Sequence, residues 1–276
     1  MNEPRLEAAL RRWRLTIEAA PVRTAAGTVA MVRRGAERLV LKLPRAEDEV
    51  RAWRVLAHWR GEGAARVIAH ARDGAVLLER ALPGHALTGR VLAGDDDGAT
   101  AAVCEVAAIL HRHAPPPGRF DRVEDWGLGF YRHRASGRGG IAAGMLERAG
   151  RVFAALAATQ GPRRLLHGDL HHDNILFDAA RGWLAIDPKG VVGEPAYEFG
   201  AALRNPGEDI LRVADTAILE RRAGIIARET GCDRERVLGW AFAQAVLAAV
   251  WSIEDGLDPA RWLAVGSAAL PLVAEA

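Results

Sequence analysis

Chemically active residue types gather in two short segments of the chain. Residues 167–174 are His-Gly-Asp-Leu-His-His-Asp-Asn, and residues 186–189 are Ile-Asp-Pro-Lys. Polar side chains that flank strands are commonly held at rigid edges that face a binding site. If the residues between the two segments form a hairpin, Asp187 returns next to Asn174, and both can converge with Asp169.

This trio has the composition that phosphoryl transfer uses. An aspartate accepts the proton of the attacking hydroxyl, while an asparagine five residues later and a second aspartate beyond the next hairpin bind Mg²⁺. Carboxylate and amide oxygens are hard ligands of the kind that Mg²⁺ prefers. The same chemistry needs an upstream lysine for the phosphate oxygens. Lys42, which precedes Glu47 and Glu49, stands where that lysine and its acidic partner belong.

Lysine is rare in this chain. The sequence has 37 lysine and arginine residues, and only Lys42 and Lys189 among them are lysine. The two side chains are not interchangeable where a compact ammonium is needed. The two lysines are therefore either retained for function or accidental survivors of a codon bias toward arginine. Lys189 either contacts substrate or phosphate, or it pairs with a neighbouring carboxylate.

The elements that must position these residues follow from the spacing of apolar side chains. Alternation predicts strands, and recurrence at helical spacing predicts helices. Strands are expected at residues 28–33, 38–43, 67–70, 75–80, 165–166, 175–177 and 183–186. Helices are expected at residues 1–20, 47–59, 100–112, 140–159, 198–203, 210–230, 234–253 and 259–273.

A break over residues 82–84, Leu-Pro-Gly, marks the expected boundary between two lobes. It separates residues 1–81, where strands are frequent, from residues 82–276, where helices dominate. Residues 94–98 contain three consecutive aspartates, and we expect them to form a solvated loop.

The composition excludes several classes of protein. With 276 residues, 50% of them hydrophobic and 26% charged, the chain is typical of a soluble globular protein. A net charge of +2 argues against a broad surface for nucleic acid. Two cysteines are too few for a disulfide framework, and the apolar stretch around residues 241–251 is shorter than a membrane span. We expect a cytoplasmic protein without a nucleic-acid or membrane partner.

Further motifs accompany the two polar segments in a fixed order. They are WRLT from residue 13, LVLKLP around Lys42, EVRAWRVLAHWRGEGAARVI after it, LLER at 77–80, DPKGVVGEPAYEFGAALRNP from Asp187 and AVLAAVWSIEDG near the end. Together with HGDLHHDN and IDPK, this set resembles the aminoglycoside phosphotransferases. Within them it is most similar to the streptomycin 6-kinase branch, grouped as aminoglycoside/hydroxyurea antibiotic resistance kinases. The resemblance extends over nearly the whole chain.

The resemblance implies an α+β fold of two lobes, like that of protein kinases. A small β-rich N-terminal lobe at residues 1–81 would bind the nucleotide, and a larger, mainly helical lobe at residues 82–276 would carry catalysis and substrate binding. It implies ATP and Mg²⁺ as cofactors. Asp169 would be the catalytic base, and Asn174 and Asp187 would be the Mg²⁺ ligands.

The nucleotide residues also follow from the resemblance. Lys42 would contact the α- and β-phosphates, with Glu49 as its ion-pair partner in preference to Glu47. The segment at residues 77–80 resembles the hinge, so Glu79 and the residues after it would offer backbone groups to the purine.

The implied reaction is transfer of the γ-phosphoryl group of ATP to a hydroxyl of a small cationic molecule. The 6-hydroxyl of streptomycin is the expected acceptor, and hydroxyurea or another small hydroxylated metabolite is the alternative. Five residues are candidate substrate contacts: His171, Lys189, Glu194, Glu254 and Asp255. His171 and His172 either bind substrate or shape the loop. A monomer or weak dimer is expected.

Two departures from the family pattern stand out. The glycine-rich phosphate loop of protein kinases is absent from the sequence, where only Gly27 precedes the first long strand. Glu198 stands where the family more often has aspartate. We expect the Glu198 carboxylate to hold the catalytic loop by hydrogen bonds, with an extra methylene to accommodate.

A different class of protein is also considered. The loop offers five residues of types that bind zinc or iron, namely His167, Asp169, His171, His172 and Asp173. A metallohydrolase would use such a set, but the spacing is unusual for one and Lys42 stays unexplained. A kinase-like binding module without activity is opposed by the presence of the base, both metal ligands and the lysine.

Overall fold

The computed structural model describes residues 3–24, 27–45, 47–116, 120–207 and 213–274, and the side chains of residues 47–51 lie outside that description. The chain divides into two compact units. Unit 1 is formed by Met1–His85 together with Leu176–Lys189, and unit 2 by Ala86–Ile175 together with Gly190–Ala276.

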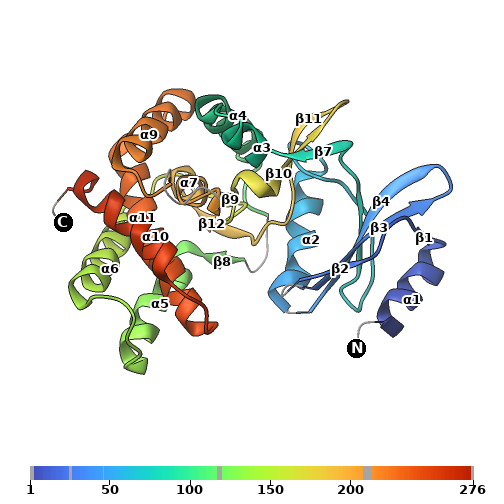
Figure 1. The fold of residues 1–276 in the computed structure, drawn as a ribbon, viewed down its shortest axis with the longest axis horizontal. Coiled ribbons are helices and arrows are strands. Elements are labelled where there is room, and N and C mark those ends of the chain that lie inside the picture. Colours follow the sequence, from blue (N-terminus) through green and yellow to red (C-terminus); the bar gives the residue numbers. More distant parts are fainter. Residues whose placement is uncertain (1–2, 25–26, 46, 117–119, 208–212, 275–276) are drawn as a thin grey trace. The chain divides into compact units, whose positions relative to one another are not determined.

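Unit 1 is built on an antiparallel sheet with strand order β1-β3-β4-β6-β5, in which β2 also pairs with β3 (Figure 1). The strands are β1 (Thr16–Ile17), β2 (Val22–Arg23), β3 (Gly27–Arg34), β4 (Glu37–Pro44), β5 (Val67–His70) and β6 (Val76–Glu79). Both hairpins predicted from the sequence, β3–β4 and β5–β6, are confirmed.

The two faces of this sheet are covered by different helices. Because side chains alternate along a strand, Leu41 and Leu43 of β4 point into the apolar core beneath α1 (Glu3–Trp13). Lys42 points to the opposite face, which α2 (Glu47–Trp59) covers. The bounds of α2 agree with the prediction. The expected first helix ends early, at Trp13, because the chain then pairs with β3 as β1.

A small second sheet has the order β11-β10-β7, with β7 (Pro83–Ala86), β10 (Ile175–Asp178) and β11 (Gly182–Ala185). The β10–β11 hairpin joins unit 1 through main-chain bonds: Ala185 N donates to Gly63 O at 2.8 Å and Ala65 N to Ala185 O at 2.9 Å. The division into units thus differs from the expected boundary after residue 81. Unit 1 continues to His85 because β7 pairs with β10, and it takes residues 176–189 from late in the sequence.

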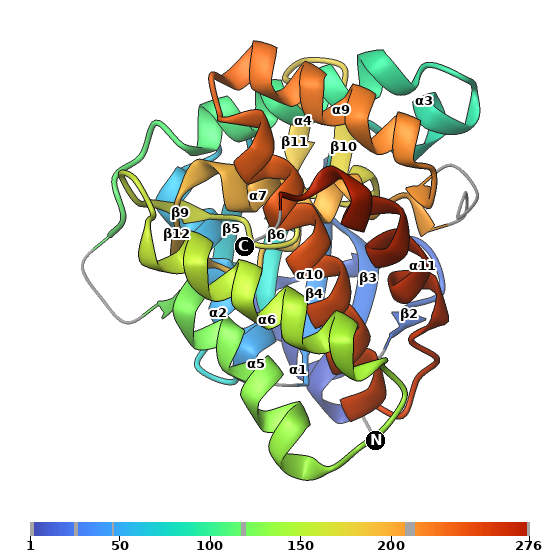
Figure 2. The ribbon, with the colours of Figure 1, turned by 90° about the vertical axis from the view of Figure 1, so that its left-hand side faces the viewer.

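Unit 2 is mainly helical. Its helices are α3 (Thr88–Leu92), α4 (Asp96–Leu110), α5 (Val123–Ser136), α6 (Ala143–Ala158), α7 (Pro195–Leu203), α9 (Thr216–Thr230), α10 (Arg234–Glu254) and α11 (Ala260–Ala269), with short 3₁₀ turns at His172–Asn174 and Leu270–Leu272. The central helix is α10, which packs against α5, α6, α7, α9 and α11 (Figure 2). It is long and apolar enough to cross a membrane, but 83% of its apolar window is buried inside the protein, as in a core helix.

A three-stranded sheet in unit 2 frames the segment that carries the polar residues. In it, β12 (Val191–Gly193) pairs antiparallel with β9 (Arg164–Leu166) and parallel with β8 (Asp121–Arg122). Residues 167–174, here called the catalytic loop after the role that the resemblance implies for them, leave β9 directly. Gly190 N donates to His167 O at 3.0 Å, so the start of the loop continues the pairing of the sheet.

The three consecutive aspartates do not form a solvated loop, so this prediction is wrong. Asp95 caps α4 by accepting from Gly98 N at 3.0 Å. Asp96 is 3% exposed and pairs with the guanidinium groups of Arg221 and Arg222 on α9. A buried carboxylate is stable here because these partners replace its hydration, and no local pattern announces partners so distant in sequence.

Candidate active site

One buried carboxylate of α7 holds the catalytic loop by hydrogen bonds. Glu198 accepts hydrogen bonds from His167 N at 2.7 Å and Gly168 N at 2.9 Å, and its Oε2 lies 3.3 Å from His111 Nε2. Burial raises the pKa of the Glu198 carboxyl, but these bonds and the charge of His111 outweigh it, so the pKa is lowered. The expected role of Glu198 is confirmed, since each of its two oxygens accepts from a backbone N–H of the loop.

A glycine is required directly before Asp169. Gly168 has φ of +82°, a conformation that side chains other than glycine rarely adopt. A Cβ atom there would lie 2.8 Å from the ring of Trp126 and 3.2 Å from Val191 Cγ1. The backbone therefore turns closely over packed side chains just before Asp169.

Asp169 is half-buried and faces two groups of its own unit. Its Oδ1 accepts from Arg204 Nη2 at 3.1 Å, and its Oδ2 lies 3.7 Å from His171 Nε2. Arg204 follows α7 and is itself buried. Sequence reasoning missed this arginine, although it belongs to the quoted motif that ends in LRNP.

Asn174 closes the same loop. Its Nδ2 donates to Asp169 O at 2.9 Å and lies 3.3 Å from His171 Nε2. Because these contacts use the amide nitrogen, the amide oxygen is the atom that a cation would bind. The structure thus brings Asp169 and Asn174 together, as predicted from the sequence, and adds His171 to them.

Asp173 and His172, also in the loop, make contacts that stabilise the structure. Asp173 accepts from Thr88 Oγ1, and its N donates to His171 Nδ1 at 3.3 Å. His172 is 1% exposed, and burial, together with the charges of Arg222 and His171, lowers its pKa to about 3. Neither ring nitrogen of His172 has a hydrogen-bond partner within the described part of the chain. Among the residues that the structure describes, no group of three or more histidines, cysteines or carboxylates is placed to hold a metal.

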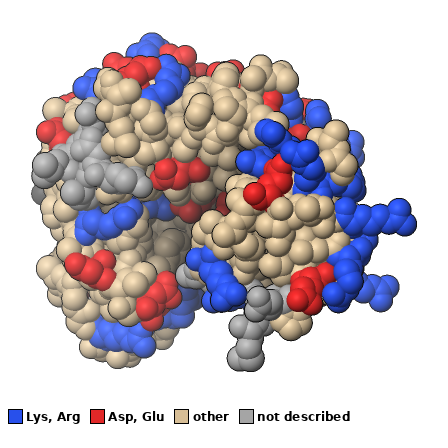
Figure 3. All heavy atoms as spheres, turned by 45° about the vertical axis from the view of Figure 1, so that its right-hand side comes forward, with Lys and Arg blue, Asp and Glu red and all other residues tan. Residues whose placement is uncertain are grey.

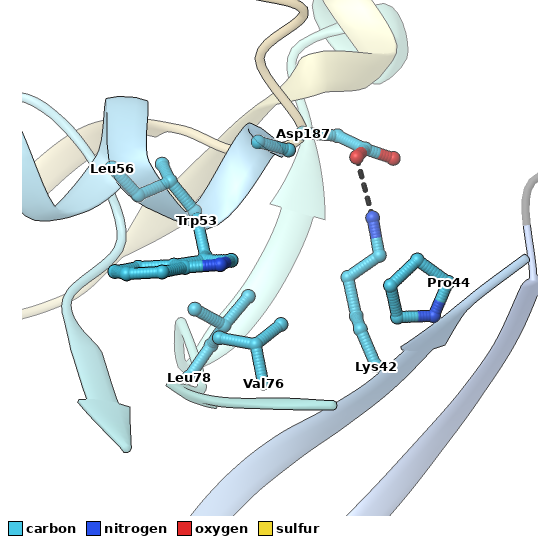
Figure 4. A pocket seen from close by; sticks show the side chains of 8 residues that line it. Lys42, Pro44, Trp53, Leu56, Val76, Leu78 and Asp187 are labelled. Carbon is cyan, nitrogen blue, oxygen red and sulfur yellow. Dashed lines mark hydrogen bonds and ion pairs between the residues drawn. The ribbon is translucent and has the colours of Figure 1, made fainter. Parts of the chain in front are cut away.

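Unit 1 carries the second pair of predicted residues. Lys42 Nζ donates to Asp187 Oδ1, and both side chains lie against a small pocket between β4, β6 and α2 (Figure 4). The pocket wall is otherwise apolar, formed by Pro44, Ala52, Trp53, Leu56, Val76 and Leu78. Asp187 has φ of +60°, which is sparsely populated for residues other than glycine. Such backbone conformations concentrate at functional sites.

Two further nucleotide residues were predicted in unit 1. The Glu49 side chain lies outside the described residues, so its pairing with Lys42 stays a prediction. The Glu79 carboxylate accepts from Arg181 and from Arg66 N, and Glu79 N donates to Arg66 O at 3.0 Å. Both the side chain and the N–H of Glu79 therefore stabilise unit 1.

The candidate substrate residues fall into different environments. Glu194 is 6% exposed and accepts from Trp240 Nε1 at 2.6 Å and from Arg236 Nε at 3.0 Å. Lys189 is exposed. Glu254 and Asp255 are exposed at the end of α10. Unit 1 carries Lys42 and Asp187, and unit 2 carries Asp169, His171 and Asn174. That these two groups form one active site stays a prediction.

The charge distribution agrees with a near-neutral protein. On the face drawn in Figure 3, acidic and basic side chains both occur among uncharged ones, with more basic side chains along the right-hand edge. No broad field of one sign covers the described residues on this face.

Solved structures identify the fold. The chain is similar to a choline/ethanolamine kinase family protein from Mesorhizobium loti, with TM-score 0.69 and 16% identity over 97% of this chain and 94% of that one. It is also similar to a thermostable mutant of the aminoglycoside phosphotransferase APH(4)-Ia in complex with ADP and hygromycin B, with TM-score 0.67 and 14% identity over 98% and 99%. The fold is the two-lobed α+β fold of protein-kinase-like phosphotransferases.

Sequence relatives identify the family. Residues 12–256 match the family described as aminoglycoside/hydroxyurea antibiotic resistance kinase. A streptomycin 3''-kinase of Klebsiella pneumoniae is 37% identical over 90% of this chain and 92% of its own length. A streptomycin 6-kinase of Streptomyces glaucescens is 32% identical over 92% and 85%, and a hydroxyurea phosphotransferase of Kitasatospora aureofaciens 32% over 90% and 72%. The chain belongs to this family of antibiotic resistance kinases and is a phosphotransferase with an alcohol group as acceptor.

Proposed function

We propose that this kinase phosphorylates streptomycin with ATP as the phosphoryl donor. The observation that carries the proposal is the catalytic loop, in which Asp169, His171 and Asn174 converge on a frame fixed by Glu198. The match to streptomycin kinases over at least nine-tenths of the chain supports the acceptor. The relatives include both a 3''-kinase and a 6-kinase, so analysis of the product must determine whether the predicted 6-hydroxyl is the one phosphorylated.

Asp169 acts in this proposal as the general base. The acceptor hydroxyl gives its proton to the Asp169 carboxylate while its oxygen forms the new bond to the γ-phosphorus. The bond from that phosphorus to the β-phosphate oxygen breaks, and ADP leaves with the electron pair. Positioning and electrostatic stabilisation provide most of the rate in such transfers.

The donor set fits Mg²⁺. The Asp187 carboxylate and the Asn174 amide oxygen are hard oxygen ligands, and an ion held with few protein carboxylates is the usual arrangement for Mg²⁺ with nucleotide phosphates. When bound, Mg²⁺ would neutralise phosphate charge. Lys42 now faces Asp187. It would turn to the α- and β-phosphates when these arrive, since an ammonium on a flexible stem can exchange one anion for another.

The backbone segment after β6 is proposed to form hydrogen bonds with the purine base. Glu79 N already donates to Arg66 O, and Leu82 N donates to Asp178 Oδ2 at 3.0 Å. The backbone between them, at Arg80 and Ala81, is therefore where we propose the purine to bind, within the segment of Glu79 and the residues after it that the sequence predicted.

A cationic acceptor needs carboxylates near the catalytic loop in unit 2. Glu254 and Asp255 are exposed and are retained as candidates, together with His171 at the loop itself. We assign Glu194 to structure, because its buried carboxylate already holds Arg236 and Trp240. Lys189 is exposed and two residues from Asp187, where contact with substrate or phosphate is a reasonable role to test.

The test is product formation with purified protein. We expect ATP- and Mg²⁺-dependent phosphorylation of streptomycin and its loss in Asp169→Ala, with the modified hydroxyl identified by NMR of the product. Hydroxyurea is the second acceptor in the panel, because one relative is a hydroxyurea phosphotransferase. Absence of transfer to both acceptors would contradict the proposal. The cytoplasmic location and the monomeric or weakly dimeric state stay predictions.

A further inference from the structure

The cation that faces the catalytic base comes from the interior of unit 2. The Arg204 side chain is 8% exposed, while that of Asp169 is 28% exposed. The Nη2 of Arg204 contacts Asp169 Oδ1 at 3.1 Å, which satisfies one oxygen of the carboxylate. The other oxygen, Oδ2, is the one on the side of His171.

Arg204 is itself fixed at two further points. Its Nη1 donates to Gln244 Oε1 at 2.9 Å, and its guanidinium lies 5.7 Å from the ring centroid of Trp262. Gln244 is 4% exposed and donates to Tyr197 O at 2.6 Å. The fork of Arg204 is therefore held by α10 and α11 before it meets Asp169.

The helix that precedes Arg204 is shaped for this arrangement. At Gly200 of α7, an added Cβ atom would lie 2.5 Å from Gln244 Cδ. The Gln244 amide can reach across α7 only because residue 200 has no side chain. The absence of a side chain at Gly200, the hydrogen bonds of Gln244 and burial thus together fix the orientation of the Arg204 guanidinium.

We propose that Arg204 is the positioning residue of the catalytic base. By binding Oδ1 it fixes the rotation of the Asp169 carboxylate and assigns Oδ2 to the acceptor hydroxyl. An error of about 1 Å in the placement of such a group can lower a rate by about 10²-fold. The inference rests on the proposed function in that Asp169 must be the base.

A matched control exists at the other end of α7. Arg236 pairs with the buried carboxylate of Glu194, the N-cap residue of α7, as Arg204 pairs with Asp169 beyond its C-terminus. Arg236→Gln also removes a cation from a buried carboxylate, but it touches no residue of the catalytic loop. It therefore reports the effect of lost stability alone.

The first experiment compares steady-state kinetics with streptomycin and ATP. We expect Arg204→Gln to lower kcat about 10²-fold with KM for both substrates little changed, and Arg204→Lys to lower it less. Millimolar guanidinium, far below denaturing concentrations, should restore part of the activity of Arg204→Ala and none in Arg236→Gln. Equal loss of kcat in Arg204→Gln and Arg236→Gln, or a loss confined to KM, would overturn the proposal.

The second experiment needs no substrate. In a double-mutant cycle on thermal unfolding, Arg204→Gln should lower Tm less in the Asp169→Asn background than in the wild type, since the contact is already weakened there. Additive changes in Tm would show that the two side chains are not coupled. If coupling is found but the wild type transfers phosphate to no acceptor, the proposed function fails while the contact stands.

Discussion

The carboxylates of Asp187 and Asp169 each face one cation, but the two cations are held in different ways. Lys42 extends from β4 across an apolar pocket and contacts Asp187 with a single ammonium group. Arg204 is buried and has its fork fixed by Gln244 and by contact with Asp169. An ammonium on a flexible stem can rotate toward a new anion, whereas a fixed guanidinium fork cannot.

The difference matches the work that each carboxylate would do. A metal ligand must exchange its cation for a metal when nucleotide binds, so a partner that leaves easily is an advantage. A base must present the same oxygen in every turnover, so a partner that stays is an advantage. The four predictions below run from the largest expected effect to the smallest. The first and the last test this distinction directly, and the other two test the loop that carries Asp169.

The two aspartates should separate catalysis from nucleotide binding. Asp169→Asn is expected to lower kcat by roughly 10²- to 10⁴-fold, the range for loss of a general base, with Mg²⁺–nucleotide affinity unchanged. Asp187→Asn should lower both kcat and the affinity for the Mg²⁺–nucleotide complex. Titration calorimetry with a non-hydrolysable ATP analogue checks the affinities, and equal weakening of nucleotide binding in the two variants would contradict the division of roles.

The buried histidine of the catalytic loop should make unit 2 sensitive to acid. His172 has a pKa of about 3 in the folded protein and an ordinary value of 6.5 when unfolded. Stability is therefore full above 6.5 and falls as pH drops toward 3, by up to about 1.4 kcal/mol per pH unit. Urea unfolding over this range should show a smaller slope in His172→Leu, and an unchanged slope would exclude His172 as the source.

The contribution of Glu198 to stability should depend on pH over a different range from that of His172. The pKa of Glu198 is lowered from 4.5, so its stabilising effect is present above that value and is lost as pH falls through the folded pKa. At neutral pH, Glu198→Gln is expected to lower the free energy of unfolding by about 2 kcal/mol, because one buried N–H loses its acceptor. The difference from wild type should shrink below pH 4.5, as measured by urea unfolding. A constant difference at all pH values would point to packing instead of charge.

The lysine should matter least for stability. Lys42 and Asp187 have side chains 20% and 33% exposed, so water screens their pairing. Lys42→Met is expected to change the free energy of unfolding by less than about 1 kcal/mol while weakening nucleotide binding. A larger loss of stability, seen by chemical denaturation, would mean that Lys42 is fixed as firmly as Arg204.

Local pattern was enough to predict the longer strands and the candidate catalytic residues, whereas the short strands β1, β2, β7, β8 and β12 were missed. The β3–β4 hairpin follows from strict alternation, and the spacing of Asp169 and Asn174 follows from the chemistry of one short loop. Both depend on residues close together in sequence. That locality is why sequence reasoning reaches them.

Contacts between distant, buried polar residues were beyond such reasoning. Arg204 meets Gln244 across 40 positions and Asp169 across 35, and its place in the LRNP motif does not reveal these partners. The same holds for Asp96, whose partner Arg222 is 126 positions away. The helix α5 was missed as well: its interior glycines, Gly127 and Gly129, weaken the local helical signal.

Both ends of α7 are tied to α10, through Glu194 and Trp240 at one end and Arg204 and Gln244 at the other. The proposed base is thereby fixed to α10, the central helix of unit 2, and not to the surface of the unit. Exposed positions such as Asp255 can then diversify toward new acceptors while the geometry of the base persists. Directed evolution of this kinase should accordingly keep the buried links of α7 and collect its substitutions outside them.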